Sequence, residues 1–86
     1  MDQETRELRS LSKKLEPIAR IGKNGLTAGM LNQLYQMLDK KNLIKIKLLR
    51  SSFAGNEKEK FIEELVMKTQ SKLIDSVGNV VVLYRP

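Results

Sequence analysis

Apolar side chains recur with helical spacing in three segments of the chain. Leu8, Leu11 and Leu15 are three and four positions apart, so residues 5–15 are predicted to form an amphipathic helix that ends before Pro17. Residues 28–41 repeat the pattern behind Thr27, a favourable N-cap residue. Residues 57–69 carry a third apolar stripe under a charged face. Three helices are therefore expected.

Other segments have the pattern and composition of strands. Residues 43–49 alternate apolar side chains with lysines, a period of two that predicts a strand with one buried face. Residues 17–21 follow the first helix and predict a short strand that opens with proline. Residues 73–77 and 80–84 are rich in β-branched side chains and flank Gly78-Asn79, which predicts a tight hairpin. Val77 is then expected opposite Val80, Asp75 opposite Val82, and Leu73 opposite Tyr84.

The resulting order is α-β-α-β-α-β-β, and residues 1–86 are too few for more than one domain. A strand, a helix and a strand in succession imply a parallel crossover, whereas the final hairpin adds an antiparallel pair. The expected fold is an α/β two-layer sandwich with a mixed four-stranded sheet. The pattern leaves open which face of the sheet the first helix covers.

Composition excludes several classes of function. The chain has no cysteine and no histidine, so it lacks the usual zinc ligands, thiol nucleophiles and imidazole bases. We therefore predict a protein that is not an enzyme and has no catalytic residues, metal, cofactor or small-molecule substrate. No apolar run approaches the length of a membrane span, and the acidic start does not resemble a signal peptide. A cytoplasmic monomer without membrane contact is expected.

Positive charge is concentrated in the first part of the chain. The formal net charge is +6, yet eleven of the sixteen basic residues and only three of the ten acidic residues lie between Arg6 and Arg50. A basic region on a small domain is typical of nucleic-acid binding, because Lys and Arg neutralise phosphates and release counterions. A merely solvated surface is the alternative that charge alone leaves open.

The glycine-rich segment Gly22-Lys23-Asn24-Gly25 is predicted to connect a strand to a helix. Glycines allow a nucleic-acid backbone to approach closely, and the positive end of a helix attracts anions. Arg20 and Lys23 add charge to this position. The segment is a candidate phosphate clamp, although such sequences also form turns that bind nothing.

The strand at residues 43–49 carries the second group of candidates. Lys45 and Lys47 project from one face of this strand, and Arg50 follows it. Lysines in a central strand are costly unless their face stays wet, so this face is predicted to be an open basic surface that contacts RNA or is simply hydrated. The chain has only four aromatic residues, which favours contact with the backbone of structured RNA over stacking of single-stranded bases.

Three blocks of the chain together resemble the CRM domain, the chloroplast RNA splicing and ribosome maturation module. They are residues 21–27 around Gly22-Lys23-Asn24-Gly25, residues 43–47, and the ending from Val77 to Pro86. A chain with one such domain is similar to the stand-alone prokaryotic YhbY type. The resemblance implies RNA binding, association with precursors of the large ribosomal subunit, and a fold akin to the carboxy-terminal domain of a bacterial translation initiation factor. It places the family's loop on residues 22–25 and its basic strand on Lys45 and Lys47.

The leading hypothesis is therefore a non-catalytic RNA-binding protein that acts in large ribosomal subunit assembly. The alternative is a protein-interaction adaptor of RNA-protein particles, in which Leu43, Leu49 and Phe53 form a docking patch and the basic residues only confer solubility. The predicted RNA-binding residues are Arg20, Gly22, Lys23, Asn24, Gly25, Lys45, Lys47 and Arg50.

Overall fold

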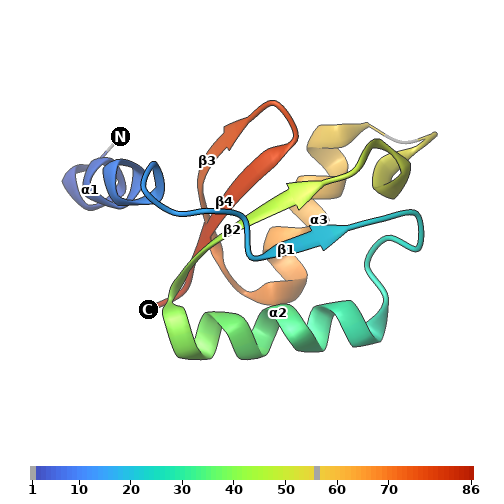
Figure 1. Ribbon diagram of the computed structural model, residues 1–86, viewed down its shortest axis with the longest axis horizontal. Coiled ribbons are helices and arrows are strands. Elements are labelled where there is room, and N and C mark those ends of the chain that lie inside the picture. Colours follow the sequence, from blue (N-terminus) through green and yellow to red (C-terminus); the bar gives the residue numbers. More distant parts are fainter. Residues whose placement is uncertain (1, 56) are drawn as a thin grey trace.

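The computed structural model describes residues 2–55 and 57–86, which form a four-stranded sheet with helices on both faces. The elements are α1 (Gln3–Ser12), β1 (Ala19–Ile21), α2 (Ala28–Lys41), β2 (Leu43–Leu48), the short 3-10 helix η1 (Arg50–Phe53), α3 (Lys58–Thr69), β3 (Lys72–Val77) and β4 (Val80–Tyr84) (Figure 1). Their order and type confirm the prediction of a mixed α/β fold. The first helix ends at Ser12, whereas the sequence pattern predicts that it continues to residue 15.

The strands are arranged in the order β1-β2-β4-β3. β1 runs parallel to β2, as a strand-helix-strand crossover through α2 requires. β4 is antiparallel to both β2 and β3, so the terminal hairpin inserts β4 into the middle of the sheet. The mixed sheet leaves β1 and β3 at its two edges.

The main core lies between the sheet and the pair α2 and α3. Its buried members are Ile21, Leu34, Leu38, Ile44, Ile46, Leu48, Phe61, Ile62, Leu65, Val81 and Leu83. In β2 these are the alternate positions 44, 46 and 48, which is the half-buried pattern that the sequence predicts. α2 begins as expected, because the Thr27 hydroxyl accepts a hydrogen bond from the amide of Met30 over 3.1 Å.

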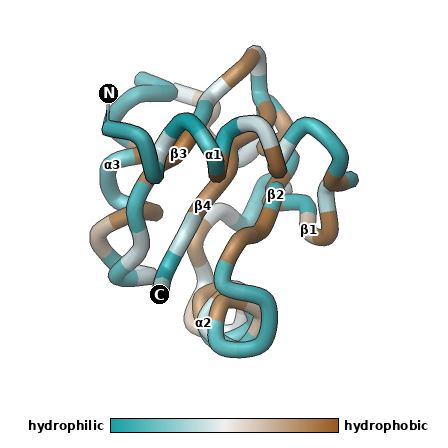
Figure 2. The backbone as a smooth tube through the Cα atoms, turned by 90° about the vertical axis from the view of Figure 1, so that its left-hand side faces the viewer, coloured by the Kyte–Doolittle hydropathy of each residue, from teal (hydrophilic) through white to brown (hydrophobic). Residues whose placement is uncertain are grey.

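The first helix packs on the opposite face of the sheet. Figure 2, turned by 90° from Figure 1, shows α1 crossing in front of the sheet, where it contacts β2 and β3. Its buried residues are Thr5 and Ser12, two polar side chains, whereas Leu11 is 54% exposed. The expectation that Leu8, Leu11 and Leu15 mark the packed stripe is thus wrong for Leu11 and Leu15. The helix docks through small side chains that allow it to approach the sheet closely.

The hairpin has one irregularity that the sequence did not predict. Val77 pairs with Val80 and Asp75 pairs with Val82, as expected, but the register shifts between Leu73 and Asp75. Leu73 consequently pairs with Leu83, and the expected pairing with Tyr84 is wrong. A bulge of this kind adds one residue to β3 and changes the faces on which the preceding side chains lie.

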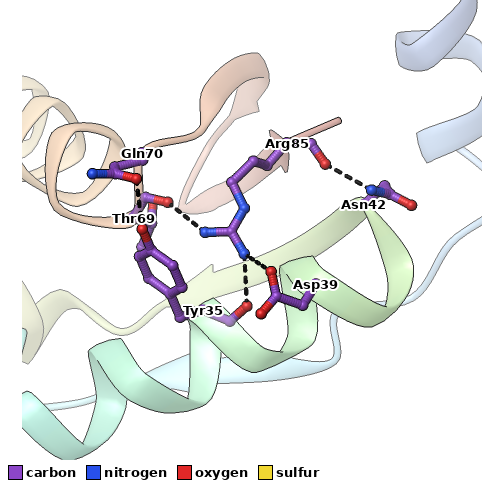
Figure 3. Close-up of polar contacts among 6 residues, drawn as sticks. All are labelled: Tyr35, Asp39, Asn42, Thr69, Gln70 and Arg85. Carbon is purple, nitrogen blue, oxygen red and sulfur yellow. Dashed lines mark hydrogen bonds and ion pairs between the residues drawn. The ribbon is translucent and has the colours of Figure 1, made fainter.

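The end of the chain is held against α2 and α3 by Arg85. Its guanidinium lies 4.0 Å from the centre of the Tyr35 ring and donates to the backbone oxygens of Thr69 and Tyr35 and to Asp39 (Figure 3). Its side chain is only 14% exposed. Arg85 is therefore a structural residue, and its charge is not available on the open surface.

Candidate nucleic-acid interface

Arg20 and Lys47 lie side by side on the face of the sheet that is opposite the main core. The two residues are direct partners in the parallel pairing of β1 with β2. Both side chains are exposed, whereas their neighbours Ile21 and Leu48 point into the core. The pairing thus brings together two cations that are 27 positions apart in the sequence.

The glycine-rich segment forms a tight turn between β1 and α2. The amide of Gly25 donates to the carbonyl oxygen of Gly22 over 2.9 Å, and Gly25 has a φ of 64°. This left-handed conformation explains why glycine stands there, because most side chains are strained at positive φ. Lys23 and Asn24 occupy the exposed tip of the turn. Their backbone amides donate no backbone hydrogen bond within the described part of the chain, so both are free to meet an anion.

The turn is packed against η1, which brings Arg50 to the same end of the sheet. The amide of Leu49 donates to the carbonyl oxygen of Ile21 over 2.9 Å, and a Cβ at Gly25 would lie 3.7 Å from the carbonyl oxygen of Ser52. These contacts place the start of η1 beside the end of β1. Arg50 is exposed at this position.

Four cations therefore occupy one region, which we call the basic rim: Arg20, Lys23, Lys47 and Arg50. None of them forms a salt bridge with an acidic residue among residues 2–55 and 57–86. The basic residues that do form salt bridges lie elsewhere, as in the pairs Arg9–Asp75 and Lys68–Glu64. Unpaired, exposed cations are suited to phosphate groups because no internal bond has to be broken.

Lys45 differs from the other predicted residues. It shares a face of β2 with Lys47, but its side chain is half-buried beneath the end of α1. Its ammonium group donates to the carbonyl oxygens of Ser12 and Leu15 over 3.2 and 3.3 Å. The open basic face expected around Lys45 is thus partly covered by α1, and Lys45 satisfies one carbonyl group at the C-terminal end of that helix and one in the segment that follows it.

The aromatic residues form no stacking platform. Phe61 is buried, while Tyr35, Phe53 and Tyr84 are half-buried. Phe53 packs against Phe61 with 6.1 Å between the ring centres, and it adjoins the main core. The adaptor patch of Leu43, Leu49 and Phe53 is therefore not formed as a unit, because Phe53 is engaged and Leu43 and Leu49 lie at opposite ends of β2.

A groove on the α1 face was not predicted from the sequence. It has a volume of about 300 Å³ and is lined by Ser12, Lys13, Lys45, Asp75, Val77, Val80 and Val82. Its residues come from α1, the residue after it, and three strands, so only the docking of α1 could reveal it.

No helix in the described ranges is long and apolar enough to cross a membrane. The same residues contain no cluster of acidic side chains arranged to hold a metal ion.

Comparison with known proteins identifies the family. The family model of the CRS1 / YhbY (CRM) domain matches residues 1–85. The chain is 35% identical to Probable RNA-binding protein YqeI of Bacillus subtilis (strain 168), over 93% of this chain and 81% of YqeI. It is 33% identical to a protein of Haemophilus influenzae named RNA-binding protein, over 92% and 78% of the two chains.

A solved structure agrees with the fold. The solution structure of the hypothetical protein SAV1595 from Staphylococcus aureus matches with a TM-score of 0.79 and 34% identity, covering 98% of this chain and 85% of that chain. The chain therefore belongs to the CRS1 / YhbY (CRM) domain family, as its motif blocks predict. Its relatives are named for RNA binding and not for an enzymatic activity, in agreement with the class predicted from composition.

Proposed function

We propose that the protein binds the sugar-phosphate backbone of structured RNA through the basic rim and the Gly22–Gly25 turn. The observation that carries this proposal is the gathering of four exposed, unpaired cations around a turn whose tip amides are free. Phosphate oxygens accept hydrogen bonds from both kinds of group. The turn and the rim then bind successive phosphates of one strand.

Two further observations support RNA as the partner. YqeI and the relative from Haemophilus influenzae are both named as RNA-binding proteins. The aromatic side chains are at least half-buried, so recognition rests on shape and phosphate positions more than on stacked bases. No observation gives comparable support to the adaptor hypothesis.

The RNA that we propose is ribosomal RNA in precursors of the large ribosomal subunit, bound in the cytoplasm by the monomer. The support for this step is the resemblance of residues 21–27, 43–47 and 77–86 to the CRM motif blocks. Crosslinking in cells followed by sequencing of the attached RNA tests it. Reads concentrated in large-subunit RNA are expected, and reads spread over unrelated transcripts would contradict it.

The salt dependence of affinity tests the backbone contact directly. Four neutralised phosphates predict that the logarithm of affinity falls with the logarithm of salt concentration at a slope between about −3 and −4. Each change of Arg20, Lys23, Lys47 or Arg50 to methionine reduces the magnitude of the slope by about one. A slope near zero in the unmodified protein would overturn the proposal.

Sedimentation of cell extracts separates RNA contact from protein contact. Association with pre-ribosomal particles that is lost after mild RNase treatment is the expected result. Association that survives RNase treatment and is unaffected by removal of the rim cations would favour the adaptor hypothesis.

A further inference from the structure

The face of the sheet beneath α1 is arranged in two rows that run across the strands. One row consists of Asp75 on β3, Val82 on β4 and Lys45 on β2, which are register partners in the sheet. The next row consists of Val77, Val80, Lys47 and Arg20, one from each strand in the same order. The first row therefore runs from an acidic residue on β3 to a lysine on β2. The second row runs from a valine on β3 to cations on β2 and β1.

The groove occupies the β3 and β4 side of these rows. Its floor is formed by Val80 and Val82, and Val77, which is 68% exposed, stands at its edge. Its volume of about 300 Å³ is sufficient for one nucleobase. Neighbouring strands lie about 4.8 Å apart, so Lys47 is one strand and Arg20 two strands from Val80. A base in the groove would thus have its own phosphates within reach of the basic rim.

Among the polar side chains that line the groove, Asp75 is the acidic one, and the ammonium of Lys45 is a donor on the other side of Val82. The Asp75 carboxylate, 22% exposed, accepts hydrogen bonds and donates none. One of its oxygens accepts from the amide of Ser76 over 2.9 Å and lies 3.6 Å from Arg9 Nε, and no internal bond is found for the other oxygen within the described ranges. Lys45 donates two of its three N–H groups to the carbonyl oxygens of Ser12 and Leu15, at and just after the end of α1, and keeps one.

We propose that this groove binds one unpaired guanine base of the RNA, held flat on the valines with its N1–H and 2-amino group toward Asp75 and its O6 toward Lys45. Guanine presents two adjacent N–H donors, N1–H and the 2-amino group, beside the acceptor O6. It therefore offers two donors to the Asp75 carboxylate on β3 and an acceptor to the Lys45 ammonium on β2, on the two sides of Val82, whereas the other three bases offer fewer donors at their Watson-Crick edge. The inference rests on the proposed function, because Lys47 and Arg20 hold the attached phosphates.

Two RNA heptamers test the proposal, UUUGUUU and the same strand with inosine in place of guanine. Inosine lacks only the 2-amino group, so the backbone charge is identical. Fluorescence anisotropy should show the guanine strand binding at least about fivefold more tightly, the effect of one hydrogen bond to a charged acceptor. Methyl NMR signals of Val77 and Val80 should shift with the guanine strand more than with the inosine strand.

Two variants with the same charge change test whether Asp75 causes the preference for guanine over inosine. Asp75→Asn replaces an acceptor oxygen by a donor, so the guanine preference should be lost. Glu64→Gln makes the same charge change on the exposed face of α3, where Glu64 pairs only with Lys68, and should leave the preference unchanged. Thermal unfolding and an amide NMR spectrum show whether the Asp75 variant is folded. The comparison of the two strands on the unmodified protein does not depend on any variant.

The possible failures are distinguishable. Equal affinity for the two heptamers, with Lys47→Met weakening both, would overturn the guanine site and leave backbone binding intact. A guanine preference that persists in folded Asp75→Asn would also overturn this site. No binding of the heptamers or of structured RNA at low salt would overturn the proposed function itself.

Discussion

Lys45 donates a hydrogen bond to the carbonyl oxygen of Ser12 over 3.2 Å, so a lysine of the central sheet satisfies the last residue of α1. Lys47, two positions further along the same strand, has no such contact and is exposed. Residues that look equivalent in the sequence thus have different roles, since one anchors a helix and the other faces solvent.

Changing each of these lysines to methionine should separate the two roles. Lys45→Met should lower the free energy of unfolding by about 1–2 kcal/mol, because the C-terminal end of α1 loses a cation, and Ser12 and Leu15 each lose a hydrogen bond to their carbonyl oxygen. Lys47→Met should change it by less than about 0.5 kcal/mol but weaken RNA binding and flatten its salt dependence. Urea unfolding of each variant measures its stability, and RNA titration at several salt concentrations measures its affinity and the salt dependence of that affinity. Equal loss of stability in the two variants would contradict this assignment.

Substitutions at Gly25 distinguish a phosphate contact from a simple turn. Asparagine and aspartate both tolerate positive φ better than most residues, and a Cβ there meets only an ordinary contact, 3.7 Å from Ser52 O. Both variants should fold with a loss below about 1 kcal/mol. Gly25→Asp should weaken RNA binding more than about tenfold, while Gly25→Asn isolates the effect of the added side chain without its charge.

The control for the Gly25 pair is Lys23→Ala, which removes a charge at the tip of the turn and leaves the backbone unchanged. It should weaken binding and reduce the salt slope by about one. If the aspartate and asparagine variants bind structured RNA equally, and Lys23→Ala binds as the parent does, the turn has no role in binding. The phosphate contacts would then lie on Arg20 and Lys47.

Removal of the Arg85 side chain should destabilise the fold. Arg85→Met loses the contact with the Tyr35 ring and three hydrogen bonds that join the residue after β4 to α2 and α3, so the free energy of unfolding should fall by about 2–3 kcal/mol. Tyr35→Phe is the matched control, because it removes only the bond of the hydroxyl to Gln70 and should cost about 1 kcal/mol or less. A loss of stability in Arg85→Met no larger than in Tyr35→Phe would show that Arg85 does not hold the end of the chain against α2 and α3.

The N-cap of α1 predicts sensitivity to acid. The backbone amide of Thr5 donates to the Asp2 carboxylate over 2.7 Å and lowers the pKa of Asp2 to about 2, with a smaller contribution from Lys72. The unfolded chain has the ordinary pKa of about 3.9, so the stabilisation is complete above pH ~4 and is lost as the pH falls toward 2. An NMR titration of the Asp2 carboxyl carbon should show this low midpoint.

The control for this acid effect is Asp2→Asn, which keeps a side-chain oxygen at the N-cap but cannot titrate. The fraying of α1 between pH 4 and pH 2, followed by the amide signals of its first turn, should therefore be reduced in the variant. A midpoint near 3.9 for Asp2 in the unmodified protein would show that the cap does not hold in solution.

Features that depend on neighbouring residues were predictable from the sequence. The Thr27 N-cap, the alternation in β2 and the Gly78-Asn79 hairpin follow from side-chain periodicity and turn chemistry, which act over a few residues. The same holds for the turn at Gly22–Gly25, and most of the predicted cations are exposed. The three motif blocks were sufficient to identify the family, because their order and spacing are independent of the tertiary contacts.

Other features were decided only when distant segments came together. Leu11 is exposed although it lies in an apolar pattern, because α1 packs through Thr5 and Ser12 on a sheet face formed by β2, β4 and β3. The sequence predicts that Lys45 lies on an open basic surface, yet that packing turns it into an anchor for α1. Side-chain periodicity describes one element at a time, whereas burial on the second face of a sheet depends on which element arrives there and at what distance.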